Sequence, residues 1–184
     1  MQKRLIPAFL VGAGVFVFLS GCGQKGVQEE AAASHNNEDY YEVHAEGRIH
    51  VFDDAPTYLS FLSVGETAFR KVRIGDGPNG ETVVFGLTAE DKKKSEGIAG
   101  IDMFDGKLQG GEPFYGEIVN EGRINVFNNW QEMQVYKQTG EAAYRYTDIG
   151  SGPKGETVVY VLTKEEKKHR PDATIAKFRQ MRSM

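Results

Sequence analysis

Alternating apolar and polar positions predict short strands in the chain after residue 40. Residues 42–44 and 48–52 alternate on either side of Ala45-Glu46-Gly47, a pattern typical of a β-hairpin. Glycine in the turn allows the positive φ that a tight connection requires. Two further strands are predicted at 68–74 and 82–87, joined by a loop too rich in Gly and Pro for regular structure.

Helix signals lie between the second and the third of these strands. Asp53 and Asp54 can cap a helix, and Pro56 is tolerated in its first turn. The helix is predicted to run to about Ser63 and to end at Gly65, because glycine is the usual residue just past a helix end.

The chain contains an internal repeat. Residues 40–93 align with residues 115–168 at a constant offset of 75, without a gap, and are identical at 26 of 54 positions. We interpret this similarity as a tandem duplication, with repeat units at 40–94 and 115–169. The Gly-rich stretch at 95–114 is expected to be a linker.

The order of elements predicts the fold class. A short charged helix is expected to close the first unit at about 89–94, and residues 170–184 can form a C-terminal helix or tail. Each unit reads β-β-α-β-β without strand–helix–strand alternation, which favours an α+β fold with an antiparallel sheet.

The small size of each unit predicts how the two are arranged. A four-stranded sheet with one helix buries little apolar surface alone, so we expect the two units to pack as a pseudo-twofold pair. Two separate units on a tether are the alternative. The apolar strand positions expected to form the core are Ile49, Val51, Val83, Phe85, Ile124, Val126, Val158 and Tyr160.

Composition argues against nucleic-acid binding and against an intramolecular disulfide. The chain has 184 residues and a formal net charge of −4, without a basic stretch of the kind that binds phosphates. We therefore expect no nucleic-acid partner. Cys22 is the single cysteine, so no intramolecular disulfide can form.

The N-terminus has the layout of an export signal. Lys3 and Arg4 precede an apolar run at residues 5–19. The run is shorter than the roughly 20 residues that a membrane-spanning helix needs. It ends in the sequence Leu19-Ser20-Gly21-Cys22.

This ending resembles the lipobox of bacterial lipoproteins, in which two small residues precede a lipid-modified cysteine. The resemblance covers residues 1–22 and implies removal of the signal peptide 1–21 by cleavage between Gly21 and Cys22. It also implies lipid on Cys22, and two or three acyl chains anchor a protein stably. An ordinary cleaved signal or a retained anchor helix is the alternative.

The residues after the lipobox predict a tether and a location. Residues 22–39 are polar, small and aperiodic, which is typical of a flexible segment. Gly23 and Gln24 replace the aspartate that retains lipoproteins of Gram-negative bacteria at the inner membrane. The resemblance therefore implies the outer membrane, facing the periplasm, if the host is Gram-negative.

No set of catalytic residues recurs in both units. His44 corresponds to Val119 and His50 to Asn125, so neither histidine is retained. The two histidines can share a face of the hairpin, but a metal site there would need further ligands. No Gly-x-Ser-x-Gly motif occurs. We expect no enzyme, no metal site and no cofactor.

Several charged residues are retained in both units. Arg48, Arg70, Arg123 and Arg145 can form an anion site, because guanidinium groups bind carboxylate or phosphate with two hydrogen bonds. The structural alternative is cross-strand pairing of arginine with glutamate, which fixes the register of a hairpin. The retained pairs include Glu46/Glu121, Arg48/Arg123, Glu66/Glu141, Arg70/Arg145 and Glu81/Glu156.

The two predicted helices have diverged. Residues 55–64 and 130–139 share no identity in ten positions. Aromatic side chains on a divergent surface are typical of partner binding. The candidate partner surface consists of Tyr58, Phe61, Trp130 and Tyr136. The alternative is that each helix packs against a different neighbour.

The sequence therefore predicts a lipid-anchored cell-envelope protein. Its duplicated, non-catalytic α+β domain is expected to bind a protein or another envelope component. The alternative function is a periplasmic lipoprotein that binds a small anion or a metal ion through the arginines or the histidines.

Overall fold

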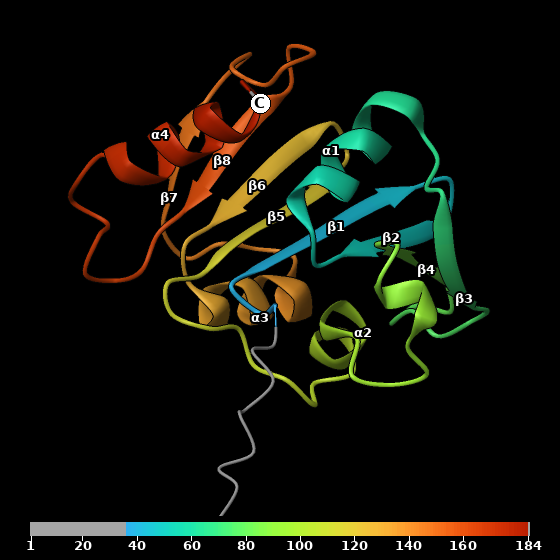
Figure 1. Cartoon of the computed structure of the whole chain (residues 1–184). Coiled ribbons are helices and arrows are strands. Elements are labelled where there is room, and N and C mark those ends of the chain that lie inside the picture. The colour runs from blue at the N-terminus through green and yellow to red at the C-terminus, as the bar shows by residue number, and fades with distance from the viewer. Residues whose placement is uncertain (1–35, 184) are drawn as a thin grey trace, which may run out of the picture. The chain divides into compact units, whose positions relative to one another are not determined.

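The computed structural model describes residues 36–183, which fold around a single eight-stranded sheet (Figure 1). The predicted signal peptide at 1–21 and the lipidation site at Cys22 lie outside the described residues. Between residues 36 and 183, no helix has the length and the apolar character needed to cross a membrane.

The first half of the domain follows the predicted order of elements. The carboxylate of Asp54 accepts a hydrogen bond from the backbone N–H of Thr57 at 2.8 Å and caps α1. Gly65 ends the helix with a φ of 82°, which costs little only for glycine. The elements are β1 (Asp39–Ala45), β2 (Arg48–Phe52), α1 (Ala55–Val64), β3 (Phe69–Arg73) and β4 (Thr82–Leu87).

The second half has the same order of elements and the same helix ends. Asn129 accepts a hydrogen bond from the backbone N–H of Glu132 at 3.0 Å, and Gly140 ends α3 with a φ of 74°. The elements are β5 (Tyr115–Asn120), β6 (Arg123–Phe127), α3 (Trp130–Thr139), β7 (Arg145–Asp148), β8 (Thr157–Val161) and α4 (Asp172–Met181).

One continuous sheet joins the two halves, in the order β3-β4-β2-β1-β5-β6-β8-β7. The central strands β1 and β5 pair in parallel, which excludes the alternative of two separate units on a tether. The predicted α+β class is confirmed. The sheet is mixed, with four antiparallel and three parallel pairings, because β4 and β8 return beside β2 and β6 after the chain passes through a helix and an edge strand.

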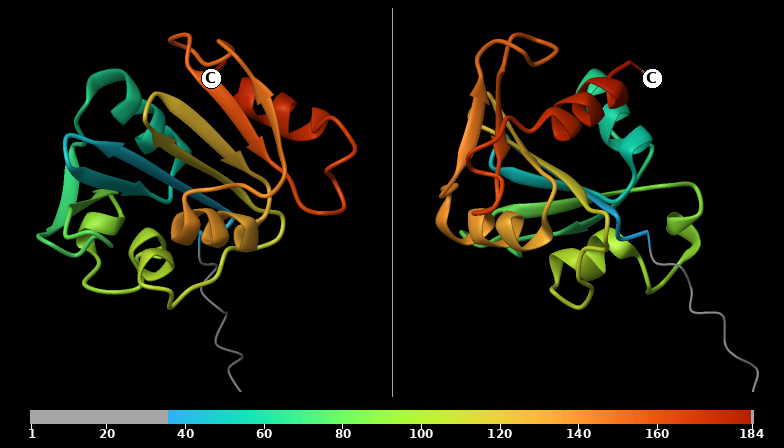
Figure 2. Two further views of the ribbon diagram at one scale, coloured as in Figure 1. Left: turned by 180° about the vertical axis from the view of Figure 1, so that it is seen from behind. Right: turned by 90° about the vertical axis from the view of Figure 1, so that its left-hand side faces the viewer.

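Helices cover both faces of the sheet. Helices α1 and α4 lie on one face, and α3 and the short helix α2 (Ala99–Phe104) lie on the other (Figures 1 and 2). All eight predicted core residues are buried, but they divide between the two faces. The α2/α3 face has Ile49, Val51, Val83 and Phe85, and the α1/α4 face has Ile124, Val126, Val158 and Tyr160.

Described residues of two predicted irregular segments pack against the domain. The linker predicted at 95–114 contains α2, whose Ile101 and Met103 are buried. The Gly-rich composition of this segment did not indicate a helix. At the end of the predicted tether, Asn37 donates a side-chain hydrogen bond to the carbonyl of Gln109 at 2.8 Å. The predicted helix at 89–94 is a three-residue 3₁₀ turn.

Asp53 ties the start of α1 to α2. Its carboxylate is buried and accepts a hydrogen bond from the backbone N–H of Gly100 at 2.6 Å. Burial raises the pKa of Asp53 to about 6, although the bond from Gly100 opposes this shift. A raised pKa means that the folded chain holds the proton more tightly than the unfolded chain. Stability from this group is therefore complete below about pH 4 and is lost as the pH rises through about 6.

We predict that Asp53→Asn removes this pH dependence, because asparagine can still accept the bond from Gly100 but carries no charge. Over pH 4 to 7 the unmodified protein should lose on the order of 2 kcal/mol more free energy of unfolding than the variant. Urea unfolding at several pH values measures the difference. Asp54→Asn, which keeps a helix cap, is the control, and its free energy of unfolding should change with pH as in the unmodified protein. The prediction is contradicted if the free energy of Asp53→Asn changes with pH as much as that of the unmodified protein.

Candidate binding cavities

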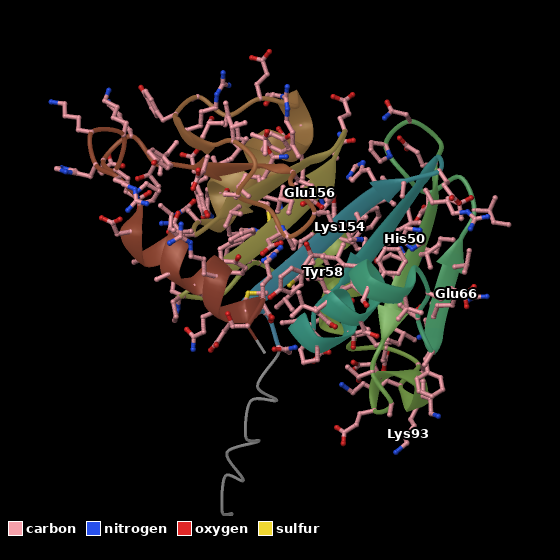
Figure 3. All side chains as sticks on the ribbon, turned by 90° about the horizontal axis from the view of Figure 1, so that it is seen from above. His50, Tyr58, Glu66, Lys93, Lys154 and Glu156 are labelled. Atoms are coloured by element: carbon pink, nitrogen blue, oxygen red, sulfur yellow. The ribbon has the colours of Figure 1, made fainter. Side chains whose placement is uncertain are left out.

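A cavity of about 560 Å³ lies on the α1 face of the sheet and is called the first cavity. It is bordered by the β1–β2 turn, the end of α1 and the edge strand β3. His50 and Glu66 lie beside α1, toward β3 (Figure 3). The side chains of Phe61 and Val84 are almost fully buried and give the cavity an apolar floor. Four exposed charged residues also line it: Glu46, Arg48, Glu66 and Arg70.

The two arginines of the first cavity do not lie opposite a glutamate on a neighbouring strand. Arg48 lies opposite Ala45 and Thr82, and Arg70 lies opposite Gly86. Neither arginine belongs to any of the ion pairs formed within residues 36–183. Cross-strand pairing of arginine with glutamate therefore does not explain these residues.

A cavity of about 300 Å³ lies on the α3 face and is called the second cavity. Four of its lining residues stand 75 positions after residues of the first cavity. In both cavities they come from the hairpin turn and the end of the helix. The corresponding pairs are Glu46/Glu121, Arg48/Arg123, Phe61/Tyr136 and Gly65/Gly140.

The four predicted anion-binding arginines do not form one site. Arg48 and Arg70 line the first cavity, and Arg123 lines the second. Arg145 is exposed at the start of β7, opposite Val161, and lines neither cavity. Arg48 and Arg70 therefore lie on the α1 face of the sheet, and Arg123 lies on the α3 face.

Both hairpin turns hold a glutamate in an unfavourable backbone conformation. Glu46 and Glu121 have φ values of 52° and 51°, in the left-handed region. Asparagine, aspartate or glycine adopts this region at lower cost. Both glutamates nevertheless stand at these positions, and each lines one of the two cavities.

A buried carboxylate stands beside the second cavity. Glu42 on β1 is 2% exposed, and its Oε1 lies 2.5 Å from the Nζ of Lys137 on α3. Tyr40 donates its hydroxyl to Glu42 at 2.6 Å, and the Nε2 of His44 lies 3.2 Å away. Burial alone would raise the pKa of Glu42, but the charge of Lys137 and these hydrogen bonds lower it to about 2. Glu42 is therefore ionised and fully paired.

The corresponding carboxylate is buried on the opposite face. Glu117 on β5 is 0% exposed and accepts hydrogen bonds from the hydroxyls of Tyr58 at 2.6 Å and Tyr115 at 2.5 Å. Arg182 binds it with two nitrogens, at 2.5 and 2.8 Å. Sequence reasoning missed this pair of glutamates. The signal was the pattern Tyr-x-Glu, present both at 40–42 and at 115–117.

The two hairpin histidines lie on opposite faces of the sheet, so the shared face that their spacing allows is not formed. Val43 pairs with His50 and His44 pairs with Ile49, so residues of equal parity on β1 and β2 point in opposite directions. The ring of His50 packs on Phe61 with centroids 4.4 Å apart. Within the described part of the chain, no group of three or more His, Cys, Asp or Glu residues is placed to hold a metal ion.

Most of the predicted partner surface is core. Tyr58 and Trp130 are 0% and 2% exposed, and Phe61 is nearly as buried, so these rings are not available to a partner as an open surface. The two helices cover opposite faces of the sheet, with Tyr58 of α1 in one core cluster and Trp130 of α3 in the other. Phe61 and Tyr136 each line one of the two cavities.

Comparison of the chain with protein-family models, with curated proteins and with solved structures gives no match.

We predict that Glu46→Asn and Glu121→Asn each stabilise the fold. Asparagine adopts the left-handed region more readily than glutamate, so each free energy of unfolding should rise, by on the order of 1 kcal/mol. Denaturant unfolding measures the change. Glu96→Asn, an exposed glutamate without a positive φ, is the control and should show no gain. A loss of stability at both turns would show that the glutamates stabilise the turns themselves.

Proposed function

We propose that this protein is a lipid-anchored cell-envelope protein whose duplicated, non-catalytic α+β domain binds a protein or another envelope component. The observation that carries the proposal is the pair of Glu-Gly-Arg turns, each beside a cavity. In both turns the charged side chains are exposed, and the glutamate is kept at a conformational cost. A bound ligand explains these residues, because its own charged groups would pair with the glutamate and arginine side chains that have no ion-pair partner within residues 36–183.

The proposal includes a tandem repeat packed with pseudo-twofold symmetry. Outward from the centre, the strands run β1-β2-β4-β3 on one side and β5-β6-β8-β7 on the other. The central pair is parallel, and α1 and α3 cover opposite faces. A twofold axis along the central strands would produce this arrangement, and it would place the two cavities on opposite faces of one domain.

The small-anion alternative has one observation in its favour. Arg48 and Arg70 line the same cavity, and two guanidinium groups can share one carboxylate or phosphate. A thermal-shift series with phosphate, acetate and zinc chloride tests this alternative, because an ion bound at a site raises the melting temperature at concentrations near its dissociation constant, whereas phosphate acts as a general stabilising salt only at high concentration.

The anchor is supported by the lipobox-like sequence that ends at Cys22. We predict that Cys22→Ala abolishes metabolic labelling with a radioactive fatty acid and leaves the precursor uncut. Ser20→Ala, which keeps a small residue before the cysteine, is the control and should be processed normally. Labelling that persists in Cys22→Ala would refute lipid attachment at this position.

A photo-crosslinking residue in the first cavity tests the binding function. We predict that p-benzoylphenylalanine in place of Thr67, which lines the cavity, forms a discrete adduct with an envelope component in cells. The same group in place of the exposed Lys168, which lines neither cavity, is the control. The Thr67 adduct should be lost when Arg48→Gln is added, because the charged rim contributes to binding. Adducts that are equal at both positions, or unaffected by Arg48→Gln, would contradict the proposal.

A further inference from the structure

We propose that the first cavity binds a short zwitterionic peptide, whose carboxylate pairs with Arg48 and Arg70 and whose ammonium group pairs with Glu46 and Glu66. This inference rests on the binding function proposed above and names the class of ligand. It follows from the charge balance, the apolar surface and the size of the cavity.

The charges of the cavity point to a ligand with both signs. Two arginines and two glutamates line it, so their formal charges sum to zero. A simple anion would satisfy the arginines but would stand among unpaired carboxylates. A zwitterion pairs with both kinds of side chain at once, and guanidinium–carboxylate pairs also fix its orientation through two parallel hydrogen bonds.

The apolar surface of the cavity points to a side chain between the two charged ends. Phe61 and Val84 form the floor, and Val72 on β3 is 49% exposed at the border. Ile74, just past β3, is 88% exposed and lines the cavity together with Val72, so the two side chains form an exposed apolar border. An aliphatic side chain of a peptide would cover part of this surface. An inorganic ion would leave it in water.

The size of the cavity agrees with a small ligand rather than with a protein domain. A volume of about 560 Å³ falls within the range of roughly 300–1,000 Å³ that is typical of small-molecule sites. Because all four charged side chains are exposed, water competes for them, and a modest affinity is expected.

Calorimetric titration of the full chain, purified from membranes in detergent, tests the inference. The probes are the tripeptide Ala-Leu-Ala with free termini, its C-terminal amide and its N-acetyl form. We expect the free tripeptide to bind and each blocked form to bind at least about tenfold more weakly, because a charge-assisted bond is lost in each case.

Two variants assign the binding to this cavity. Arg48→Gln should weaken binding of the free tripeptide by about tenfold or more, which corresponds to the loss of one charge-assisted bond. Arg179→Gln, which removes an exposed arginine on α4 outside both cavities, should leave the affinity unchanged. Circular dichroism of both variants checks that the fold is intact.

The outcomes separate this inference from the proposed function. Equal binding of free and blocked peptides, or equal binding of acetate and the tripeptide, would overturn the assignment of a zwitterionic peptide. Failure of the tripeptide to bind would also overturn it. If the Thr67 adduct still forms and still depends on Arg48, the proposed binding function stands with a different ligand.

Discussion

Two buried glutamates, one on each central strand, require charged and hydroxyl partners from the helices that pack over the sheet. Glu42 faces α3 and Glu117 faces α1 and α4, and either carboxylate left unpaired would cost several kcal/mol. Lys137 and Arg182 neutralise them, and Tyr58 adds a hydrogen bond. Because Lys137 lies on α3 and Tyr58 on α1, each helix is tied to the central strand of the other half. These bonds hold the two halves in one arrangement.

The same arrangement separates two kinds of charge. The buried glutamates are paired with cations and hydroxyl groups of the fold itself. The charges at the hairpin turns are exposed and stand at cavities, where Glu46 and Glu121 occupy left-handed positions that suit smaller residues better. The buried glutamates and their partners are explained by the stability of the fold. The glutamates at the hairpin turns instead cost stability, because their backbone is left-handed. This contrast is the physical basis of the proposed binding function.

The two cavities differ in ways that suit different occupants. The first cavity extends along the edge strand β3 and is bordered by the exposed Ile74. The second cavity is smaller and borders the buried pair of Glu42 and Lys137, so it draws residues from both halves of the domain. Under the proposed duplication, a site once present twice has kept its turn residues while its surroundings diverged. The first cavity is the larger of the two.

The sequence alone determined the local elements and the order in which they occur. Asp54 and Gly65 bound α1 as predicted, and Asn129 and Gly140 bound α3 in the same way, because capping and left-handed glycine depend on neighbours in the chain. Tertiary structure decided which face each side chain occupies, and so placed the hairpin histidines apart and buried Tyr58. It also brought together the carboxylates and their cations, which are separated by up to 95 positions in the chain. Such pairings depend on the parallel contact of β1 with β5, and alternation within a single strand carries no information about that contact.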